Sequence, residues 1–168
     1  AQRRKDLQVI AYEPQRMLYN ALCGSIALND IENLYPVMKA VSSTKEMLGV
    51  PEIDYSKPQD LGMVQLSEDG DGTPVEIMTI DQLGLNRLDF LKLDVEGYEC
   101  AALAGAMATI QKHRPYMWIE WMISGIEPIK AALARVPDYV FYRVDYQNML
   151  AVPQENLVKL KFDRVETC

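Results

Sequence analysis

Short apolar runs alternate along the chain with segments that have helical periodicity. Residues 7–12, 88–95 and 116–121 are largely apolar runs, typical of strands buried on both faces of a parallel sheet. Residues 17–26 and 103–110 carry apolar side chains three and four positions apart, which predicts helices with one buried face. Because strands alternate with helices, we expect an α/β layer fold with a mostly parallel sheet.

The later part of the chain predicts an antiparallel end to this sheet. Residues 139–145 and 149–152 are apolar runs separated by three polar or aromatic residues, a spacing that predicts a hairpin. Residues 34–41 predict a further strand. Residues 42–74 are rich in glycine, proline and aspartate and predict loops, with one short strand near residues 63–66.

Composition and charge narrow the class of protein. The 168 residues are 49% hydrophobic and 24% charged, which predicts a single globular domain over residues 1–168. The formal net charge of −7 disfavours binding to nucleic acid, since an acidic surface repels phosphates. No apolar run reaches the roughly 20 residues of a membrane span, and residues 1–14 lack the apolar stretch of a signal peptide. We therefore expect a cytoplasmic protein.

Cysteine and histidine usage excludes several kinds of site. Cys23, Cys100 and Cys168 are widely spaced and form no CxxC pair, so neither a zinc site nor a disulfide framework is predicted. His113 is the single histidine. Chemistry of the Ser-His-Asp, Cys-His or HExxH type is therefore excluded unless His113 is the one base involved.

Carboxylates stand where predicted strands end. Glu13, Asp94 and Glu120 each lie at or near such an end, and α/β sheets bind ligands outside the carboxyl ends of their strands. The two oxygens of Glu13 suit the 2′ and 3′ hydroxyls of a ribose. Each residue also has a structural interpretation: Glu13, and Asp94 with Glu96, would favour the positive N-termini of the following helices, and Glu120 would be a surface residue.

A longer pattern covers residues 75–121. Its matching positions are Thr79, Asp81, Leu83, Asp89, Phe90, Lys92, Asp94, Glu96, Gly97, Glu99, Leu103, Gly105, Ala106, Arg114, Pro115 and Glu120. This pattern resembles that of the FkbM family of S-adenosylmethionine-dependent methyltransferases, and the resemblance extends from about residue 7 to residue 153. Asn148 also fits, whereas Asp60 stands where the family usually has asparagine.

The resemblance implies a fold, a reaction and a set of site residues. The fold would be a Rossmann-like class I methyltransferase sheet, mostly parallel, with a C-terminal antiparallel hairpin. The reaction would be O-methylation of a hydroxyl on a small molecule or sugar, with S-adenosylmethionine as cofactor and this hydroxyl compound as partner. The implied catalytic residues are Asp94 and Glu120, and the implied cofactor-binding residues are Glu13, Val41, Asp94 and Glu96.

The sequence leaves the role of Asp94 and the use of a metal ion undecided. Asp94 could accept a proton from the alcohol or hold the ammonium group of the cofactor. Asp94 and Glu120 could also bind a divalent cation together, as some O-methyltransferases do. No third ligand is identifiable in the sequence, so no metal site is predicted.

One family element is missing from the sequence. The family's first strand ends in a glycine-rich Asp-x-Gly-Ala-Asn-x-Gly loop, and the single GxG here, at Gly70 and Gly72, lies in an acidic loop. We therefore expect an N-terminally incomplete methyltransferase domain that lacks the first strand and binds S-adenosylmethionine weakly or not at all. The alternative is a non-catalytic α/β module or an inactive fragment.

A missing first strand also affects strand pairing. In the family's strand order, that strand lies between residues 7–12 and residues 88–94, so both runs would have unpaired edges. We expect the two runs to pair directly with each other. The alternative is pairing with a second copy, which would make a homo-oligomer.

Overall fold

The computed structural model describes residues 4–43, 47–54, 56–57, 62, 64–67, 69, 71–157 and 163–164. The chain divides into two compact units, the first comprising Ala1–Ala40 and Lys45–Met78 and the second Val41–Thr44 and Thr79–Cys168. The single domain expected over residues 1–168 stays a prediction. Among the helices described, none combines the length and the apolar character that crossing a bilayer requires.

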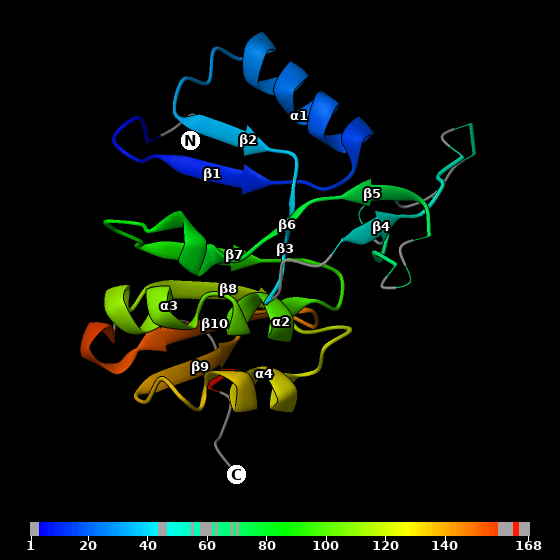
Figure 1. Ribbon diagram of the computed structural model, residues 1–168. Helices are drawn as coiled ribbons and strands as arrows, with labels where there is room; N and C mark the ends of the chain where they lie inside the picture. The colour runs from blue at the N-terminus through cyan, green and yellow to red at the C-terminus, as the bar shows by residue number, and fades with distance from the viewer. Residues whose placement is uncertain are drawn as a thin grey trace. The chain divides into compact units, whose positions relative to one another are not determined.

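The first unit is built on two parallel strands joined by a helix. Its elements are β1 (Val9–Tyr12), α1 (Arg16–Leu28), β2 (Leu34–Val37), β3 (Ala40–Val41), β4 (Leu48–Val50), β5 (Thr73–Val75) and β6 (Ile77–Met78). Strands β1 and β2 run in the same direction, with α1 as the connection between them (Figure 1). Strand β3 pairs with β6 and β4 pairs with β5, each as a separate two-stranded sheet; the second residue of β3 already belongs to the second unit.

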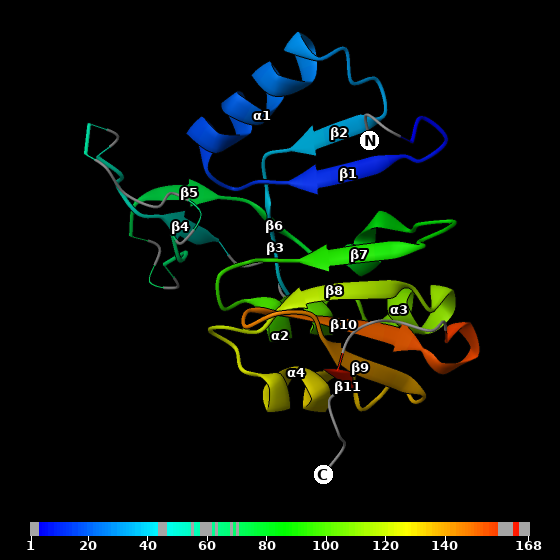
Figure 2. The same ribbon diagram turned by 180° about the vertical axis from the view of Figure 1, so that it is seen from behind.

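The second unit is a five-stranded sheet with helices. Its elements are a 3₁₀ helix (Ile80–Leu83), β7 (Phe90–Leu93), α2 (Glu99–Ala104), α3 (Met107–His113), β8 (Tyr116–Glu120), α4 (Ile126–Leu133), β9 (Tyr139–Arg143), β10 (Asn148–Pro153), a second 3₁₀ helix (Gln154–Asn156) and β11 (Asp163–Arg164). The strand order is β11-β9-β10-β8-β7. Helices α2 and α3 lie over one face of this sheet (Figures 1 and 2).

The sheet of the second unit is mixed, so the expectation of a mostly parallel sheet is wrong for the described strands. Strands β7 and β8 are parallel, whereas the pairs β8–β10, β10–β9 and β9–β11 are antiparallel. The predicted hairpin is confirmed as β9 and β10. Its tight turn reverses the chain, and because β10 rather than β9 pairs with β8, the antiparallel part begins next to β8.

Direct pairing between residues 7–12, in the first unit, and residues 88–94, in the second, stays a prediction. Strand β1 hydrogen-bonds to β2 in its own two-stranded sheet, and β7 is an edge strand of the five-stranded sheet. Pairing of these edges with a second copy stays a prediction.

Several element boundaries differ from expectation. The strand expected over residues 34–41 is divided into β2 and β3, and α1 begins at Arg16 and contains no fully buried residue. Of the strand expected near residues 63–66, Met63 lies outside the described residues and residues 64–66 are not a strand; Ser67 makes an isolated bridge with Gly49.

The core of the second unit forms between the sheet and its helices. Leu93, Met117 and Ile119 of the sheet are almost completely buried, as are Leu103 of α2 and Ile110 of α3. Burial of each such side chain stabilises the fold by about 1.5–3 kcal/mol, which fixes the positions of β7 and β8 relative to each other.

The junction of α2 and α3 explains part of the family-like pattern. A Cβ on Gly105 would lie 2.2 Å from the carbonyl oxygen of Ser42, so only glycine fits there. The Asp81 carboxylate accepts hydrogen bonds from the backbone N–H groups of Ala108 and Thr109, at 3.1 and 2.7 Å, and thereby caps α3. Asp81 and Gly105 thus serve the fold.

Candidate active site

The register of β7 and β8 places two predicted site residues side by side. Leu93 pairs with Ile119 in this parallel ladder, and both side chains are buried on the helix-covered side of the sheet. Because side chains alternate along a strand, the next residues, Asp94 and Glu120, point away from that side. The two strands end next to each other, as their arrowheads in Figure 2 show, so the two acids share one edge and one face of the sheet.

Three carboxylates meet at this edge and are called the acidic cluster below. Asp94, Glu96 and Glu120 each offer an oxygen, and these oxygens all lie within 4.8 Å of one another. Asp94 is exposed and forms an ion pair with Lys92, whose Nζ lies 2.5 Å from Oδ2, while the other two acids are half-buried. The carboxylates of Asp94 and Glu120 thus approach each other across two neighbouring strand ends. The further expectation, that they face a common cleft, stays a prediction.

The acidic cluster contains one more possible metal ligand than the sequence indicated. The sequence suggested Asp94 and Glu120 as ligands, and in the structure Glu96 supplies a third oxygen at a spacing that could hold a metal ion. Exposed carboxylates often lie this close together without a cation. The absence of a metal from the site stays a prediction.

The charge state of Glu120 differs from that of an ordinary glutamate. Burial raises its pKa to about 7, with smaller contributions from the negative charges of Asp94, Glu96 and Glu99 and from a hydrogen bond with Asp94. A carboxylate with a pKa near neutrality can both accept and return a proton at physiological pH. Glu120 is therefore chemically suited to act as a general base.

Glu99, which was not predicted from the sequence to be part of the site, joins the two loops that carry the acidic cluster. Glu99, the first residue of α2, is 1% exposed, and its Oε1 accepts hydrogen bonds from the N–H groups of Val95 at 3.1 Å and Gly97 at 3.3 Å. Its other oxygen accepts a hydrogen bond from the hydroxyl of Ser124. The β7–α2 loop (residues 94–98) and the β8–α4 loop (residues 121–125) are thus connected through one buried carboxylate.

Asn148 of β10 lies on the other side of Glu120, directly opposite it in the antiparallel ladder. The amide oxygen of Asn148 accepts a hydrogen bond from Trp118 Nε1 at 2.8 Å, and its amide nitrogen donates to Asp145 Oδ1 at 3.0 Å. Both ends of this side chain are held within the protein, so Asn148 supports the strand next to the acidic cluster.

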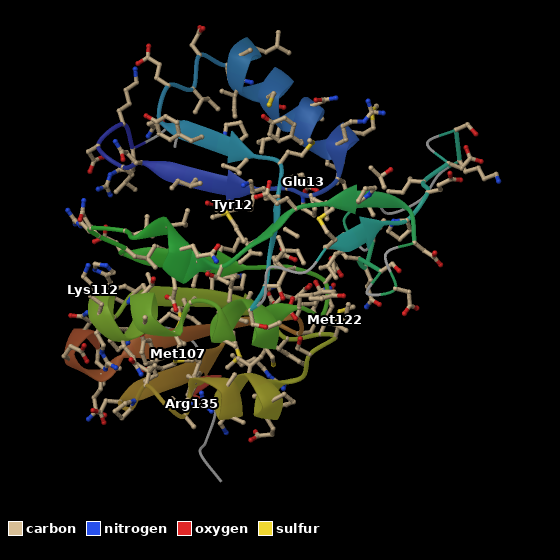
Figure 3. All side chains as sticks on the ribbon, viewed as in Figure 1. Tyr12, Glu13, Met107, Lys112, Met122 and Arg135 are labelled. Atoms are coloured by element: carbon tan, nitrogen blue, oxygen red, sulfur yellow. The ribbon has the colours of Figure 1, made fainter. Side chains whose placement is uncertain are left out.

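Glu13 lies at the end of β1, in the first unit, where Figure 3 labels it beside Tyr12. Its Oε1 accepts a hydrogen bond from the Gln15 N–H at 2.8 Å, just before α1, as the structural interpretation of this residue expected. Burial raises the pKa of Glu13, and the Gln15 hydrogen bond acts in the opposite direction. A role of Glu13 in binding ribose stays a prediction.

Val41 lies in β3 and is buried, with 8% of its surface exposed. Of the residues assigned to the site from the sequence, the structure brings together Asp94, Glu96 and Glu120, all in the second unit. Glu13 lies in the first unit and Val41 in β3. The cofactor role of Val41 stays a prediction.

Comparisons with known proteins agree with this fold. The chain matches a family model described as "Methyltransferase FkbM domain" over residues 2–147. It is similar to the crystal structure of methyltransferase FkbM from Methylobacillus flagellatus KT, with a TM-score of 0.59 and 18% sequence identity. The match covers 86% of this chain and 36% of that chain, so the chain spans about a third of the length of this solved structure. No curated protein gives a significant match.

Proposed function

The chain belongs to the FkbM methyltransferase family, and from this premise we propose that its acidic cluster is the site of S-adenosylmethionine-dependent methyl transfer to a hydroxyl of a small molecule or sugar. The observation that carries the proposal is the meeting of Asp94, Glu96 and Glu120 at the ends of two neighbouring strands. This is the edge at which α/β sheets bind their ligands.

The residues fit the cofactor by the chemistry of their polar atoms. The cofactor has an ammonium group and ribose hydroxyls, all of which donate hydrogen bonds, and ionised carboxylates only accept them. In this proposal Asp94 or Glu96 receives the ammonium group, Glu13 receives the ribose hydroxyls and Val41 offers an apolar contact. When bound, S-adenosylmethionine supplies the methyl group as an electrophile.

Glu120 provides the acid–base chemistry in this proposal. A hydroxyl that becomes a methyl ether must lose its proton, and Glu120, with a pKa of about 7, accepts it. The ion pair between Lys92 and Asp94 keeps the Asp94 carboxylate oriented at the strand end. Asp94 then either holds the ammonium group or shares the proton with Glu120.

Calorimetric titration of the full-length protein with S-adenosylmethionine and S-adenosylhomocysteine tests the proposal. The wild type should bind both, and Asp94→Asn should weaken binding by about 10- to 100-fold, the usual loss for a hydrogen bond to a charged group. Asp89→Asn is the matched control, because Asp89 pairs with Arg87 at 2.8 Å at the opposite end of β7. Binding should be unchanged in this control.

Absence of binding to the full-length protein would contradict the proposal and favour a non-catalytic α/β module. That residues 1–168 bind S-adenosylmethionine weakly or not at all stays a separate prediction, because this sequence contains no Asp-x-Gly-Ala-Asn-x-Gly loop.

A further inference from the structure

The geometry points to Glu99 as a positioning residue: we propose that its buried carboxylate holds the β7–α2 loop and the β8–α4 loop together, so that the acidic cluster keeps its arrangement. This inference rests on the proposed function, since it concerns how the same cluster is built. Glu99 itself does not touch a substrate in this proposal. It acts through the backbone that carries Asp94 and Glu96.

The carboxylate of Glu99 is buried and hydrogen-bonded through both of its oxygens. It is 1% exposed and receives three donors, the N–H groups of Val95 and Gly97 and the hydroxyl of Ser124. Burying a polar group this deeply costs free energy unless it is hydrogen-bonded, as this carboxylate is. Hydrogen bonds to a charged group are also stronger than neutral ones, so these three contacts restrain both loops.

The β7–α2 loop requires such a restraint because of its backbone conformation. Glu96 has a φ of 50° and Gly97 a φ of 96°, both in the left-handed region. Glycine adopts this region freely, but a glutamate there is strained and persists only where the surroundings hold it. The two N–H groups that flank Glu96, from Val95 and Gly97, both donate to Glu99 Oε1. This oxygen therefore fixes the turn that directs Glu96 toward the cluster.

The β8–α4 loop is connected to the same point. It follows Glu120 directly, and Figure 3 labels its residue Met122 just past the end of β8. The hydroxyl of Ser124 lies within hydrogen-bond distance of both the Glu99 carboxylate and, at 3.2 Å, the carbonyl oxygen of Gly97. With one hydrogen to donate, Ser124 serves either acceptor, and both lie at the β7–α2 side of the cluster.

Two substitutions of Glu99 separate the geometry of its side chain from its charge. Glu99→Gln keeps an oxygen that can accept from Val95 and Gly97, and its amide group can donate to the Ser124 hydroxyl oxygen. Glu99→Ala removes every one of these contacts. Both substitutions remove the negative charge, so a difference between them reports on loop geometry.

Asp81→Ala is the matched structural control. The Asp81 carboxylate also accepts two backbone N–H bonds in the second unit, from Ala108 and Thr109, and it is not part of the acidic cluster. A general loss of stability should therefore appear in this variant as well, whereas a change at the cluster should not.

The readout is the titration of the Glu120 side-chain carboxyl carbon, followed by NMR in the full-length protein. Glu120 is affected by the charges of Asp94, Glu96 and Glu99. In Glu99→Ala the released loop should let Asp94 and Glu96 move away, so the Glu120 midpoint should fall about one pH unit further than in Glu99→Gln. Asp81→Ala should titrate as the wild type does.

Equal midpoints in Glu99→Ala and Glu99→Gln would overturn the inference, because Glu99 would then act through its charge alone. If Glu99→Ala does not fold, the same titration of Glu120 in Ser124→Ala tests the inference. This variant breaks the contact between the two loops and leaves the Glu99 carboxylate in place. A lowered Glu120 midpoint in Ser124→Ala supports the inference and an unchanged one overturns it. None of these titrations requires S-adenosylmethionine, so failure of the proposed function would appear separately, as absence of cofactor binding to the wild type.

Discussion

The carboxylates of Asp94 and Glu120 lie within 4.8 Å of each other. Each of these acids comes directly after a buried residue, Leu93 or Ile119, and these two residues are paired in the parallel ladder of β7 and β8. Adjacent strands are about 4.8 Å apart, so side chains at equivalent heights on one face have to meet. Burial raises the pKa of Glu120 to about 7, and the negative charge of Asp94 adds to this effect. This relationship places a carboxyl that titrates near neutral pH at the edge of the sheet where a ligand would bind.

The raised pKa of Glu120 predicts a pH-dependent effect on stability. Its pKa is about 7 in the folded protein against 4.5 for an ordinary glutamate, so between these values the folded protein holds a proton that the unfolded chain has released. Stability should therefore fall as the pH rises through this window. Glu120→Gln should be more stable than the wild type at pH 8, by at most about 1 kcal/mol because water screens the cluster, and equally stable at pH 4.

Denaturant unfolding at the two pH values checks this prediction. Glu127→Gln is the control, because Glu127 lies on α4 in an exposed ion pair with Lys130. A Glu120→Gln variant that is less stable than the wild type at pH 8 would mean that Glu120 is ionised and favourably bound there.

Gly105→Ala should destabilise the protein by about 1–3 kcal/mol, the usual cost of forcing an extra methyl group into a packed core. The new methyl group would lie 2.2 Å from the Ser42 carbonyl oxygen, which belongs to the backbone and cannot turn away. Gly24→Ala is the matched control, because a Cβ at Gly24 meets nothing within 4 Å and the residue lies inside α1. This control should stabilise the helix by up to about 1 kcal/mol. Thermal melts that rank the two variants in the opposite order would contradict the packing described here.

The bidentate ion pair of Arg114 and Glu155 predicts a loss of stability in acid. Both contacts measure 2.9 Å, and the hydrogen bonds from Arg114 lower the pKa of Glu155 to about 2. A carboxylate with a lowered folded-state pKa stabilises the fold above its ordinary pKa of 4.5, and this contribution is lost as the pH falls toward 2. Glu155→Gln should therefore have a lower Tm than the wild type at pH 6, with a difference that narrows toward pH 2. A difference that stays constant over this range would show that the charge of Glu155 is not involved.

Glu13→Gln should weaken binding of S-adenosylmethionine to the full-length protein by about 1–3 kcal/mol, the loss expected for a charge-assisted hydrogen bond. The fold should persist, because Glu13 lies at a strand end and the amide oxygen of glutamine can still accept from the Gln15 N–H. Calorimetry measures the affinity, and Glu32→Gln, at an exposed loop position, is the control. An unchanged affinity would leave Glu13 with a structural role at the start of α1.

Some of the site could be predicted from the sequence because it depends on local patterns. The apolar runs of β7 and β8 are recognisable, and parallel strands end at a common edge, so an acid at the end of each strand predicts the approach of Asp94 and Glu120. The hairpin of β9 and β10 is similarly local, since two apolar runs with a short polar spacer form it.

The remaining features depend on contacts between distant residues. The pairing of β10 rather than β9 with β8 joins residues far apart in the chain, and no short sequence pattern predicts it. The left-handed backbone of Glu96 is unusual for a glutamate, so its direction toward the acidic cluster could not be expected from the sequence. In the sequence, Glu99 looks like an ordinary acidic residue at the start of a helix. Its contact with Ser124 joins residues 25 positions apart, so the sequence does not reveal it.

The most direct test of the central claim is methyl transfer by the full-length protein and its Glu120→Gln variant, measured as release of S-adenosylhomocysteine with a library of sugars and small alcohols. If Glu120 accepts the proton of the acceptor hydroxyl, the wild type should turn over. Glu120→Gln should then bind S-adenosylmethionine as the wild type does and transfer the methyl group about 10²- to 10⁴-fold more slowly. Glu127→Gln should match the wild type. Transfer by Glu120→Gln at the wild-type rate would contradict the assignment of the acidic cluster as the catalytic site.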